Sequence, residues 1–452
     1  MTNTIKLYDN YPYQTEFKAT ILSAEPAKKG WTIVLDQTLF FPEEGGQSAD
    51  DGWLGVVDQS DASESAADGV EAASCKWTVT DVQIRDGVIY HSVIIPGGSK
   101  TAEPGMEVCG RINWQKRFSN MQNHTGEHIL SGLIHAKYGF ENVGFHLSEN
   151  IVTFDQSGYL SPEQLAEIEQ EANRIVWGNL PVTAQYLSPE DAKGKTYRSK
   201  IEIDGDVRLV TIGEASDPVD VCACCAPHVA RTGEIGLIKI LRSEKYKGGT
   251  RLTILCGERA LAEVSKRQEQ IEHISHLLRA KQDEAYEAVS HLYDENVAQK
   301  ERLNGMQEEK IRRLAEEALA ARTVSATEEV SEAPGGASTA PDGASATPGP
   351  GENIWIFTEG LDPLPHRNLV NFLTERVEGY VGVFLPADEP ALANADKQED
   401  ITYRFIIGSR TQDSREVAAI LREQYGAKGG GKPEMVQGSV CTNQEDLLKI
   451  LP

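Results

Sequence analysis

The chain has 452 residues, of which 40% are hydrophobic, and it carries a net charge of −25. This length predicts about three domains, and the hydrophobic content is typical of a globular protein. No run of about 18 apolar residues exists, and the first residues (Met-Thr-Asn-Thr-Ile-Lys) lack the apolar core of a signal peptide. The sequence therefore predicts a cytoplasmic protein with no membrane contact.

Residues 1–110 are predicted to form a small β-barrel domain. Short runs that alternate apolar and polar side chains are separated by Gly, Pro and Asp, which is typical of strands joined by turns. The segment 58–74 is rich in Ser, Ala, Asp and Glu, and we expect a disordered loop inserted in a hairpin. The alternating runs are residues 32–35, 53–57, 77–84 and 88–95.

Residues 111–256 are predicted to form a second, α/β domain. Residues 114–138 have a helical pattern, and residues 162–177 place apolar side chains three or four positions apart, as on one face of a helix. A strand is expected at residues 151–154. Strands mixed with turns are expected across residues 182–255.

The rest of the chain is predicted to contain a helical segment, a linker and a third domain. Residues 257–322 are rich in Glu, Ala, Lys, Gln and Leu and predict a long helix or helical hairpin, interpreted as a coiled coil that serves as a spacer or dimer seam. Residues 323–353 contain no Lys, Arg or aromatic residue and predict a disordered linker. Residues 354–452 alternate strands and helices, with a glycine-rich loop at 428–434. The predicted class is therefore α+β.

Two short motifs supply four candidate metal ligands. His124 and His128 are four residues apart on a predicted helix, so their side chains share one face. Cys224 and His228 repeat this spacing about a hundred residues later. A His₃Cys set suits one tetrahedral zinc ion, and no redox signature favours another metal. Cys222 and Cys225 are nearby thiols, but only Cys224 lies four residues before a histidine.

The ligand set leaves the role of the metal open. Four protein ligands are usual for a structural zinc, whereas a catalytic zinc usually keeps one position for water. Glu127 adds another interpretation, because residues 124–128 also match the His-x-x-Glu-His pattern of inverted zinc peptidases, in which the Glu is the general base. The downstream Cys-x-x-x-His motif is not typical of those peptidases.

A third segment, residues 36–50, contains two adjacent glycines, Gly45 and Gly46, after a predicted strand. Such glycines let the backbone approach a ligand closely, or they form a tight turn. Thr38 offers a hydroxyl that could recognise a small polar substrate. Because the net charge repels nucleic acid, any such partner would need local basic patches. Candidates are Lys116-Arg117 and the segments 193–200 and 242–251.

Taken together, these segments resemble the editing half of alanyl-tRNA synthetase and its free-standing relatives, the AlaX proteins. The resemblance covers nearly the whole chain outside the two low-complexity stretches. Two departures are Phe41, where the family has Tyr, and Cys-Cys-Ala-Pro-His, where the family often has Cys-Gly-Gly-Thr-His. The matching motifs are residues 40–47 (Phe-Phe-Pro-Glu-Glu-Gly-Gly-Gln), 123–128 (Asn-His-Thr-Gly-Glu-His), 224–236, 249–252 and the glycine-rich 428–438.

The resemblance implies a long-form AlaX protein that removes serine, with glycine as a second candidate, from mischarged tRNA-Ala. It implies zinc at His124, His128, Cys224 and His228, and substrate recognition by Thr38, Gly45, Gly46 and Gln47, with Thr38 at the serine hydroxyl. It also implies that the carboxy-terminal domain helps to grip the tRNA, that the helical segment supports a homodimer, and that ATP-dependent charging is absent. The competing hypotheses are a tRNA-binding module with a structural zinc and, more remotely, the peptidase. The residues assigned to nucleic-acid binding are Lys428, Gly429, Gly430, Gly431 and Lys432.

Overall fold

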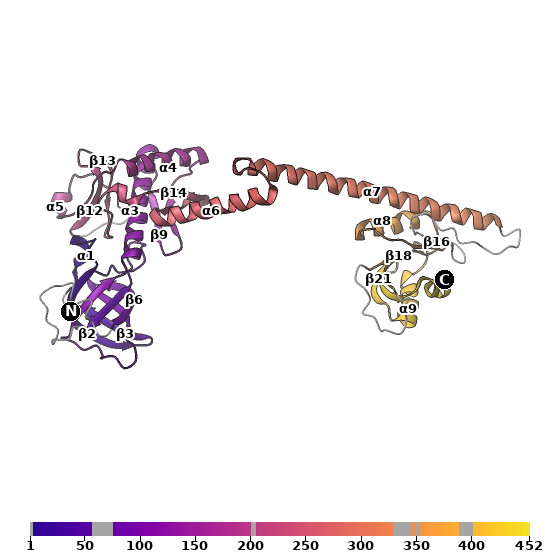
Figure 1. The fold of residues 1–452 in the computed structure, drawn as a ribbon, viewed down its shortest axis with the longest axis horizontal. Helices are drawn as coiled ribbons and strands as arrows, with labels where there is room; N and C mark the ends of the chain where they lie inside the picture. Colours follow the sequence, from indigo (N-terminus) through magenta and orange to yellow (C-terminus); the bar gives the residue numbers. More distant parts are fainter. Residues whose placement is uncertain (1–2, 57–75, 200–204, 329–344, 349–352, 388–400) are drawn as a thin grey trace. The chain divides into compact units, whose positions relative to one another are not determined.

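The computed structural model describes residues 3–56, 76–199, 205–328, 345–348, 353–387 and 401–452. It divides into two compact units, residues 1–274 and 275–452 (Figure 1). The architecture is mixed α+β, as the sequence predicted. Among the described residues, no helix combines the length and the apolar character needed to cross a membrane.

The first part of the amino-terminal unit is a closed six-stranded barrel, which confirms the predicted β-barrel (Figure 1). Alternate side chains such as Ile33, Leu35, Trp77 and Val79 fill its core. The short strand β1 (Ile5–Lys6) pairs in parallel with β4 (Gln37–Thr38), and α1 (Leu7–Asn10) follows β1. The predicted loop 58–74 lies outside the described residues. Around the barrel the strands are β2 (Glu16–Ala27), β3 (Gly30–Leu35), β7 (Val88–Ile94), β6 (Lys76–Arg85), β5 (Gly52–Val56) and β8 (Glu107–Ile112).

The second part of this unit is built around one buried helix, α3 (Trp114–Tyr138). The Asn113 side chain caps its start by accepting from the Lys116 amide, and Gly139, in the left-handed conformation, ends it. Helix α4 (Pro162–Trp177) begins with a capping box formed by Ser161 and Gln164. Both helices confirm the predicted elements.

Two antiparallel sheets surround α3. One has the order β14 (Ile238–Tyr246), β15 (Gly249–Cys256), β10 (Val152–Gln156), β9 (Asn142–Leu147), and the other has β11 (Val182–Leu187), β12 (Val207–Glu214), β13 (Asp217–Ala223). Helix α5 (Pro189–Ala192) and the 3₁₀ turn η2 (Thr232–Ile235) complete this part. Ile129, Leu130 and Ile134 of α3 share one apolar core with Phe154 and Leu252. The helix is therefore fixed by packing along most of its length.

The predicted helical segment forms α6 (Gly257–Leu278), the 3₁₀ turn η3 (Gln282–Glu284) and α7 (Ala285–Glu328). Its assembly as a coiled coil stays a prediction. Of the predicted linker, residues up to Glu328 belong to α7 and residues 345–348 form a strand, and the segments 329–344 and 349–352 lie outside the described residues.

The carboxy-terminal unit contains a six-stranded sheet with its own core. Leu314 and Ala318 of α7 pack with Leu369 and Leu373 of α8 (Pro363–Thr374). The predicted glycine-rich loop at 428–434 is wrong over most of its length, because Lys428–Lys432 form a strand paired with residues 435–439. In order, the strands are β16 (Ser345–Pro348), β17 (Ile354–Phe357), β18 (Val381–Pro386), β19 (Ile401–Gly408), β21 (Met435–Thr442) and β20 (Lys428–Lys432), with helices α9 (Ser414–Tyr425) and α10 (Gln444–Ile450).

Candidate metal centre and adjoining cavity

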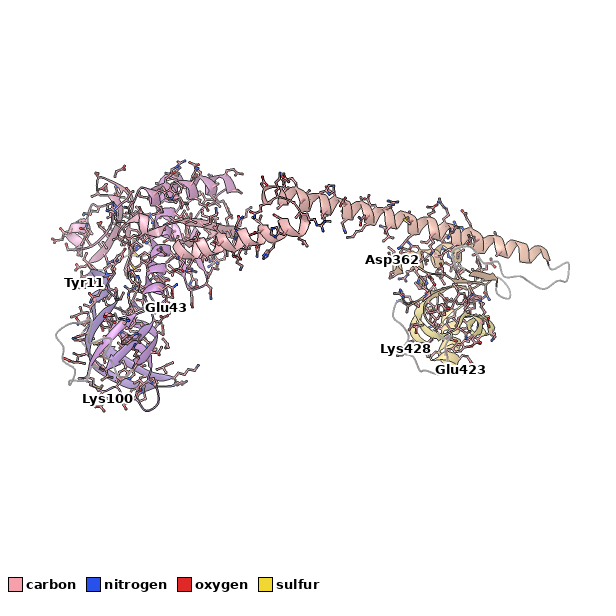
Figure 2. All side chains as sticks on the ribbon, viewed as in Figure 1. Tyr11, Glu43, Lys100, Asp362, Glu423 and Lys428 are labelled. Atoms are coloured by element: carbon pink, nitrogen blue, oxygen red, sulfur yellow. The ribbon has the colours of Figure 1, made fainter. Side chains whose placement is uncertain are left out.

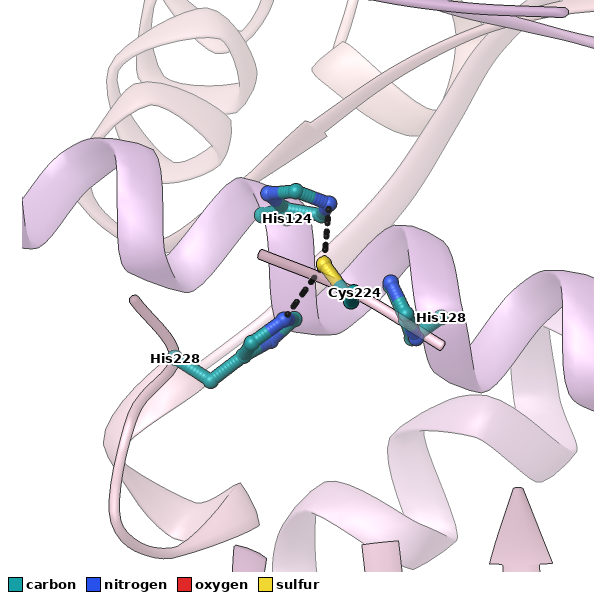
Figure 3. A group of neighbouring side chains, drawn as sticks. All are labelled: His124, His128, Cys224 and His228. Atoms are coloured by element: carbon teal, nitrogen blue, oxygen red, sulfur yellow. Dashed lines mark hydrogen bonds between the residues drawn. The ribbon is translucent and has the colours of Figure 1, made fainter. Parts of the chain in front are cut away.

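The structure brings together all four side chains that the sequence singled out as metal ligands (Figure 3). One ligand atom from each of His124, His128, Cys224 and His228 lies within 4.8 Å of every other. The Cys224 Sγ is 3.6 Å from His124 Nε2 and 3.4 Å from His228 Nε2. Such a group of three imidazoles and one thiol is suited to a tetrahedral zinc ion.

The elements that carry these ligands are held close by backbone and small-residue contacts. The Asn123 side chain accepts from the Cys256 amide at 2.8 Å, which ties α3 to the end of β15. A side chain at Gly126 would overlap the Cys256 sulfur, so glycine allows this approach. The Arg208 guanidinium donates to the carbonyl oxygens of Cys224 and Ala226 at 2.9 and 3.0 Å, which fixes the loop that carries Cys224.

Each of the three histidines also has a separate partner at Nδ1. His124 Nδ1 lies 2.8 Å from the Gln47 amide oxygen, and His128 Nδ1 lies 3.3 Å from Asp220. His228 Nδ1 lies 3.0 Å from the Thr125 hydroxyl, which itself donates to the Met121 carbonyl and so accepts from the ring. With Nδ1 occupied, Nε2 is the atom that each ring presents to a metal.

The electrostatics of the cluster favour the protonation states in which Cys224 and His228 bind a metal, a thiolate and a neutral imidazole. Burial raises the pKa of Cys224, but the imidazoles of His124 and His228 outweigh this effect and hold its pKa well below the usual value. Burial lowers the pKa of His228 to about 3, so this ring is neutral. Burial also lowers the pKa of His128, but neighbouring thiol and carboxylate groups raise it well above its usual value. A metal ion at Nε2 would compete with that proton.

A cavity of about 550 Å³ adjoins the ligand cluster. This volume is within the range of sites for small ligands. Glu127 lines it with only 1% of its surface exposed, and its carboxylate accepts from the Asn142 side chain. The wall therefore combines candidate metal ligands with the glycine pair and a buried acid; its members include Gly45, Gly46, His124, Glu127, His128 and Cys224.

The glycine pair is shaped by its contacts with β9. Gly45 and Gly46 have φ angles of +63° and +85°, which side chains rarely adopt. A side chain at Gly46 would overlap the Phe145 carbonyl, and the Gly46 carbonyl accepts from the Leu147 amide at 2.7 Å. This close pairing places the buried Gln47 against His124.

Thr38 is not among the residues that line this cavity. Its hydroxyl is completely buried and lies 3.0 Å from His91 Nε2. His91 donates from Nδ1 to the Ile33 carbonyl, so Nε2 accepts and the Thr38 hydroxyl donates to it; the same oxygen accepts from the Phe40 amide at 3.1 Å. The hydroxyl thus positions, from inside the barrel, the start of residues 36–50, which we call the glycine segment.

Two further features were missed by reading the sequence. Asp220 contacts His128, and only its spacing from Cys222 and Cys224, at alternate positions along an extended segment, could have indicated this. Arg117 was a candidate for a basic patch, which is wrong: it is completely buried and ion-paired with Asp50. Lys428 and Lys432 are exposed on β20 of the carboxy-terminal unit, where Figure 2 labels Lys428.

Comparison with known proteins supports the resemblance that the sequence motifs indicated. Residues 207–253 match the family model described as the threonyl and alanyl tRNA synthetase second additional domain. The chain is 36% identical over 302 residues to the alanine–tRNA ligase of Pyrococcus abyssi, which covers 65% of this chain and 30% of the ligase. It is 30% identical over 264 residues to the alanyl-tRNA editing protein AlaX-L of Pyrococcus horikoshii, which covers 58% of this chain and 60% of that protein.

The ordered motifs and these similarities agree with each other. The chain spans less than a third of the length of the ligase and three fifths of the length of the editing protein. Within that span it shares the domain found in both threonyl and alanyl synthetases. These similarities support an AlaX-type alanyl-tRNA editing family for this chain.

Proposed function

We propose that this protein is a deacylase that hydrolyses the ester between serine and the 3′ end of tRNA-Ala. The observation that carries the proposal is the cavity beside the ligand cluster, because it joins His124, His128 and Cys224 to Gly45 and Gly46 in one wall. A second, hydrolytic site is useful where a synthetic pocket cannot reject an amino acid that merely adds a hydroxyl.

The residues of the cluster fit a zinc ion, and we propose His124, His128, Cys224 and His228 as its ligands. A zinc ion supplies Lewis-acid polarisation of a carbonyl and a lowered pKa of bound water. The protein's own contribution is to hold the ester. Gly45 and Gly46 add no side chains of their own to that wall, so their backbone is accessible there, which supports a place for the terminal adenosine.

Recognition of the serine hydroxyl is the finer part of the proposal. Both hydrogen-bonding directions of the Thr38 hydroxyl are already used inside the barrel, so its contribution is the placement of the segment from Phe40 to Gln47. Asn142, whose side chain lines the cavity, donates one amide N–H to Glu127 and has a second N–H that is better placed to meet a hydroxyl. Glycine is the second candidate substrate, because it is smaller than serine.

The test is a deacylation assay with zinc-loaded protein, without ATP, on tRNA-Ala charged with serine, glycine or alanine. We expect serine to be released rapidly and alanine to be left largely intact. Cys224→Ala should abolish release, whereas Cys441→Ala, at an exposed position of the carboxy-terminal unit, should not. Failure of the zinc-loaded wild-type protein to release serine would overturn the proposal.

A tRNA-binding module with a structural zinc is the second candidate, and the four-ligand set favours it. In that case His128→Ala would unfold the domain, and wild-type protein would bind tRNA without hydrolysing it. A folded His128→Ala variant that has lost only hydrolysis would exclude this function. The remote peptidase function requires Glu127→Gln to abolish cleavage of casein, and absence of cleavage by wild type would dispose of it.

Two further parts of the proposal concern the rest of the chain. We propose that Lys428 and Lys432 on β20 contact the tRNA backbone, since both are exposed cations on an otherwise side-chain-free glycine strand. We also propose that α6 and α7 support a homodimer. Exposed apolar side chains on both helices, among them Leu261, Leu277 and Leu292, support this.

A further inference from the structure

A second group of candidate ligands lies directly beside the first one. His128, Asp220 and Cys222 are all buried, and their ligand atoms lie within 4.8 Å of one another. This group is either a second metal site or a support for the first. We propose that Asp220, held in place by Arg198, is a positioning residue that orients His128 for the metal ion. The inference rests on the metal centre proposed above.

The backbone brings Asp220 to the ligand helix. Side chains at alternate positions of a strand point to the same face, so Asp220 and Cys222 of β13 share the face that continues to Cys224. Gly132 lies one helical turn after His128. A Cβ atom at Gly132 would lie 2.8 Å from the Asp220 Cβ, so glycine permits strand and helix to approach at this point.

The hydrogen bonds of Asp220 fix the tautomer of His128. Asp220 Oδ2 lies 3.3 Å from His128 Nδ1, and both side chains are nearly inaccessible to solvent. An ionised carboxylate only accepts, so His128 Nδ1 carries a hydrogen and Nε2 is the nitrogen at which a metal ion can replace the second proton. The ring is thereby oriented with Nε2 toward the other three ligands. Carboxylates that accept from the second nitrogen of a metal-bound histidine also increase the basicity of that ligand.

Arg198 distinguishes this role from a second metal site. Its Nε lies 2.7 Å from Asp220 Oδ1 and its Nη2 lies 2.8 Å from Oδ2, so the guanidinium covers both carboxylate oxygens. The same Nη2 donates to the Ser131 hydroxyl of α3 at 3.0 Å. A second cation would have to displace this bidentate pair, whereas a positioning carboxylate uses the pair as its own support.

The Asp220 acceptor also differs in kind from its two counterparts. His124 and His228 have neutral acceptors, the Gln47 amide and the Thr125 hydroxyl. Asp220 is therefore the charged acceptor among the three. A buried carboxylate requires a partner charge, which explains why Arg198 accompanies it.

The experiment measures metal binding by the full-length protein. Zinc dissociation constants are obtained by competition with a chromophoric chelator, and the visible absorption of the cobalt(II) form reports the ligand geometry. Asp220→Ala and Arg198→Met should each weaken zinc binding, Asp220→Ala roughly 10- to 100-fold, and should alter the cobalt spectrum. Asp217→Asn, at an exposed position of the same strand, is the control and should change neither.

Asp220→Asn keeps the side-chain volume and one accepting oxygen, so the measurement does not depend on the folding of the alanine variant. Its zinc affinity should lie between those of wild type and Asp220→Ala. Unchanged zinc affinity and an unchanged cobalt spectrum in both folded variants would overturn the inference. Two zinc ions per wild-type chain, with one lost on substitution of Asp220, would also overturn it. None of these readouts needs tRNA, so a protein that passes them without releasing serine contradicts the proposed function alone.

Discussion

Arg117 shows how a single buried ion pair holds the glycine segment against the ligand helix. Its guanidinium pairs with Asp50 and donates to the Leu39 carbonyl at 2.5 Å, and Asp50 in turn accepts from the Phe41 amide at 2.7 Å. Arg117 and Asp50 are 0% and 1% exposed. The pair therefore connects α3 to both ends of the segment that contains Gly45 and Gly46.

We predict that Arg117→Met lowers the free energy of unfolding by about 3–5 kcal/mol, because it leaves the Asp50 charge buried without its partner. Urea denaturation checks this. Arg242→Met is the control, since the pair of Arg242 with Glu244 is largely exposed and should contribute about 0–1 kcal/mol. A loss for Arg117→Met no larger than for the control would contradict the prediction.

We predict that the buried His91 ring makes the barrel less stable to unfolding at acid pH. Burial lowers its pKa to about 4 from the usual 6.5, and the ring is 0% exposed. The unfolded chain thus binds more protons between these values, so the free energy of unfolding is highest above pH 6.5 and decreases as the pH falls toward 4, by about 3 kcal/mol. Burial lowers the pKa of His366 in the carboxy-terminal unit to about 4 as well, with the same sign.

The measurement is denaturant unfolding at pH 7 and pH 4.5. In His91→Gln, the free energy of unfolding of the amino-terminal unit should depend less on pH. This should hold even if the glutamine packs less well than histidine in the buried position and lowers the stability at pH 7. His276→Gln, at an exposed position of α6, should leave the dependence as it is. Equal dependence on pH in wild type and His91→Gln would refute this assignment.

At the scale of elements, the glycine segment is the point where barrel, β9 and α3 meet. We predict that Gly46→Ala destabilises the amino-terminal unit, since alanine at a φ of +85° costs about 1–2 kcal/mol and its Cβ overlaps the Phe145 carbonyl. It should also weaken zinc binding, because displacement of the segment moves Gln47 away from His124. Both effects are measured by urea denaturation and chelator competition.

Gly248→Ala is a matched control for this prediction. Gly248 also has a φ of +85°, but a Cβ there would meet no atom within 4 Å. The difference between the two variants therefore isolates the steric overlap at Gly46. Equal losses of stability and equal zinc affinities in the two variants would show that the contact with β9 does not matter.

The elements also show what the sequence could and could not predict. The alternation of apolar residues predicted barrel strands, and the spacing of four residues predicted that His124 and His128 share a helix face. The contact of Arg117 with Asp50 joins positions 67 residues apart, which no local periodicity reveals. Residues 428–434 were expected to form a glycine-rich loop. Glycine disfavours strands, but the pairing of Lys428–Lys432 with β21 overrides this preference.

At the scale of the molecule, the net charge of −25 must be reconciled with a polyanionic partner. Binding to a nucleic acid follows the phosphates that local cations neutralise, so an acidic protein can bind through a small basic surface. Lys428 and Lys432 lie at the two ends of β20, and all five residues of this strand are exposed. The carboxy-terminal unit has its own apolar core, so it can present this strand independently of the metal centre.

We predict that the double variant Lys428→Ala/Lys432→Ala weakens binding to tRNA-Ala and reduces the slope of log Kd against log salt by about 1 for each lysine, because each neutralised phosphate releases counterions. The rate of serine release at saturating tRNA should be unchanged, since these residues belong to a different unit from the metal ligands. Lys449→Ala, which removes a lysine paired with Asp446 at 2.7 Å, is the control and should leave the slope as in wild type. If the double variant keeps the wild-type slope, β20 does not contact the tRNA backbone, and the basic surface must be sought among the other lysines and arginines of the chain.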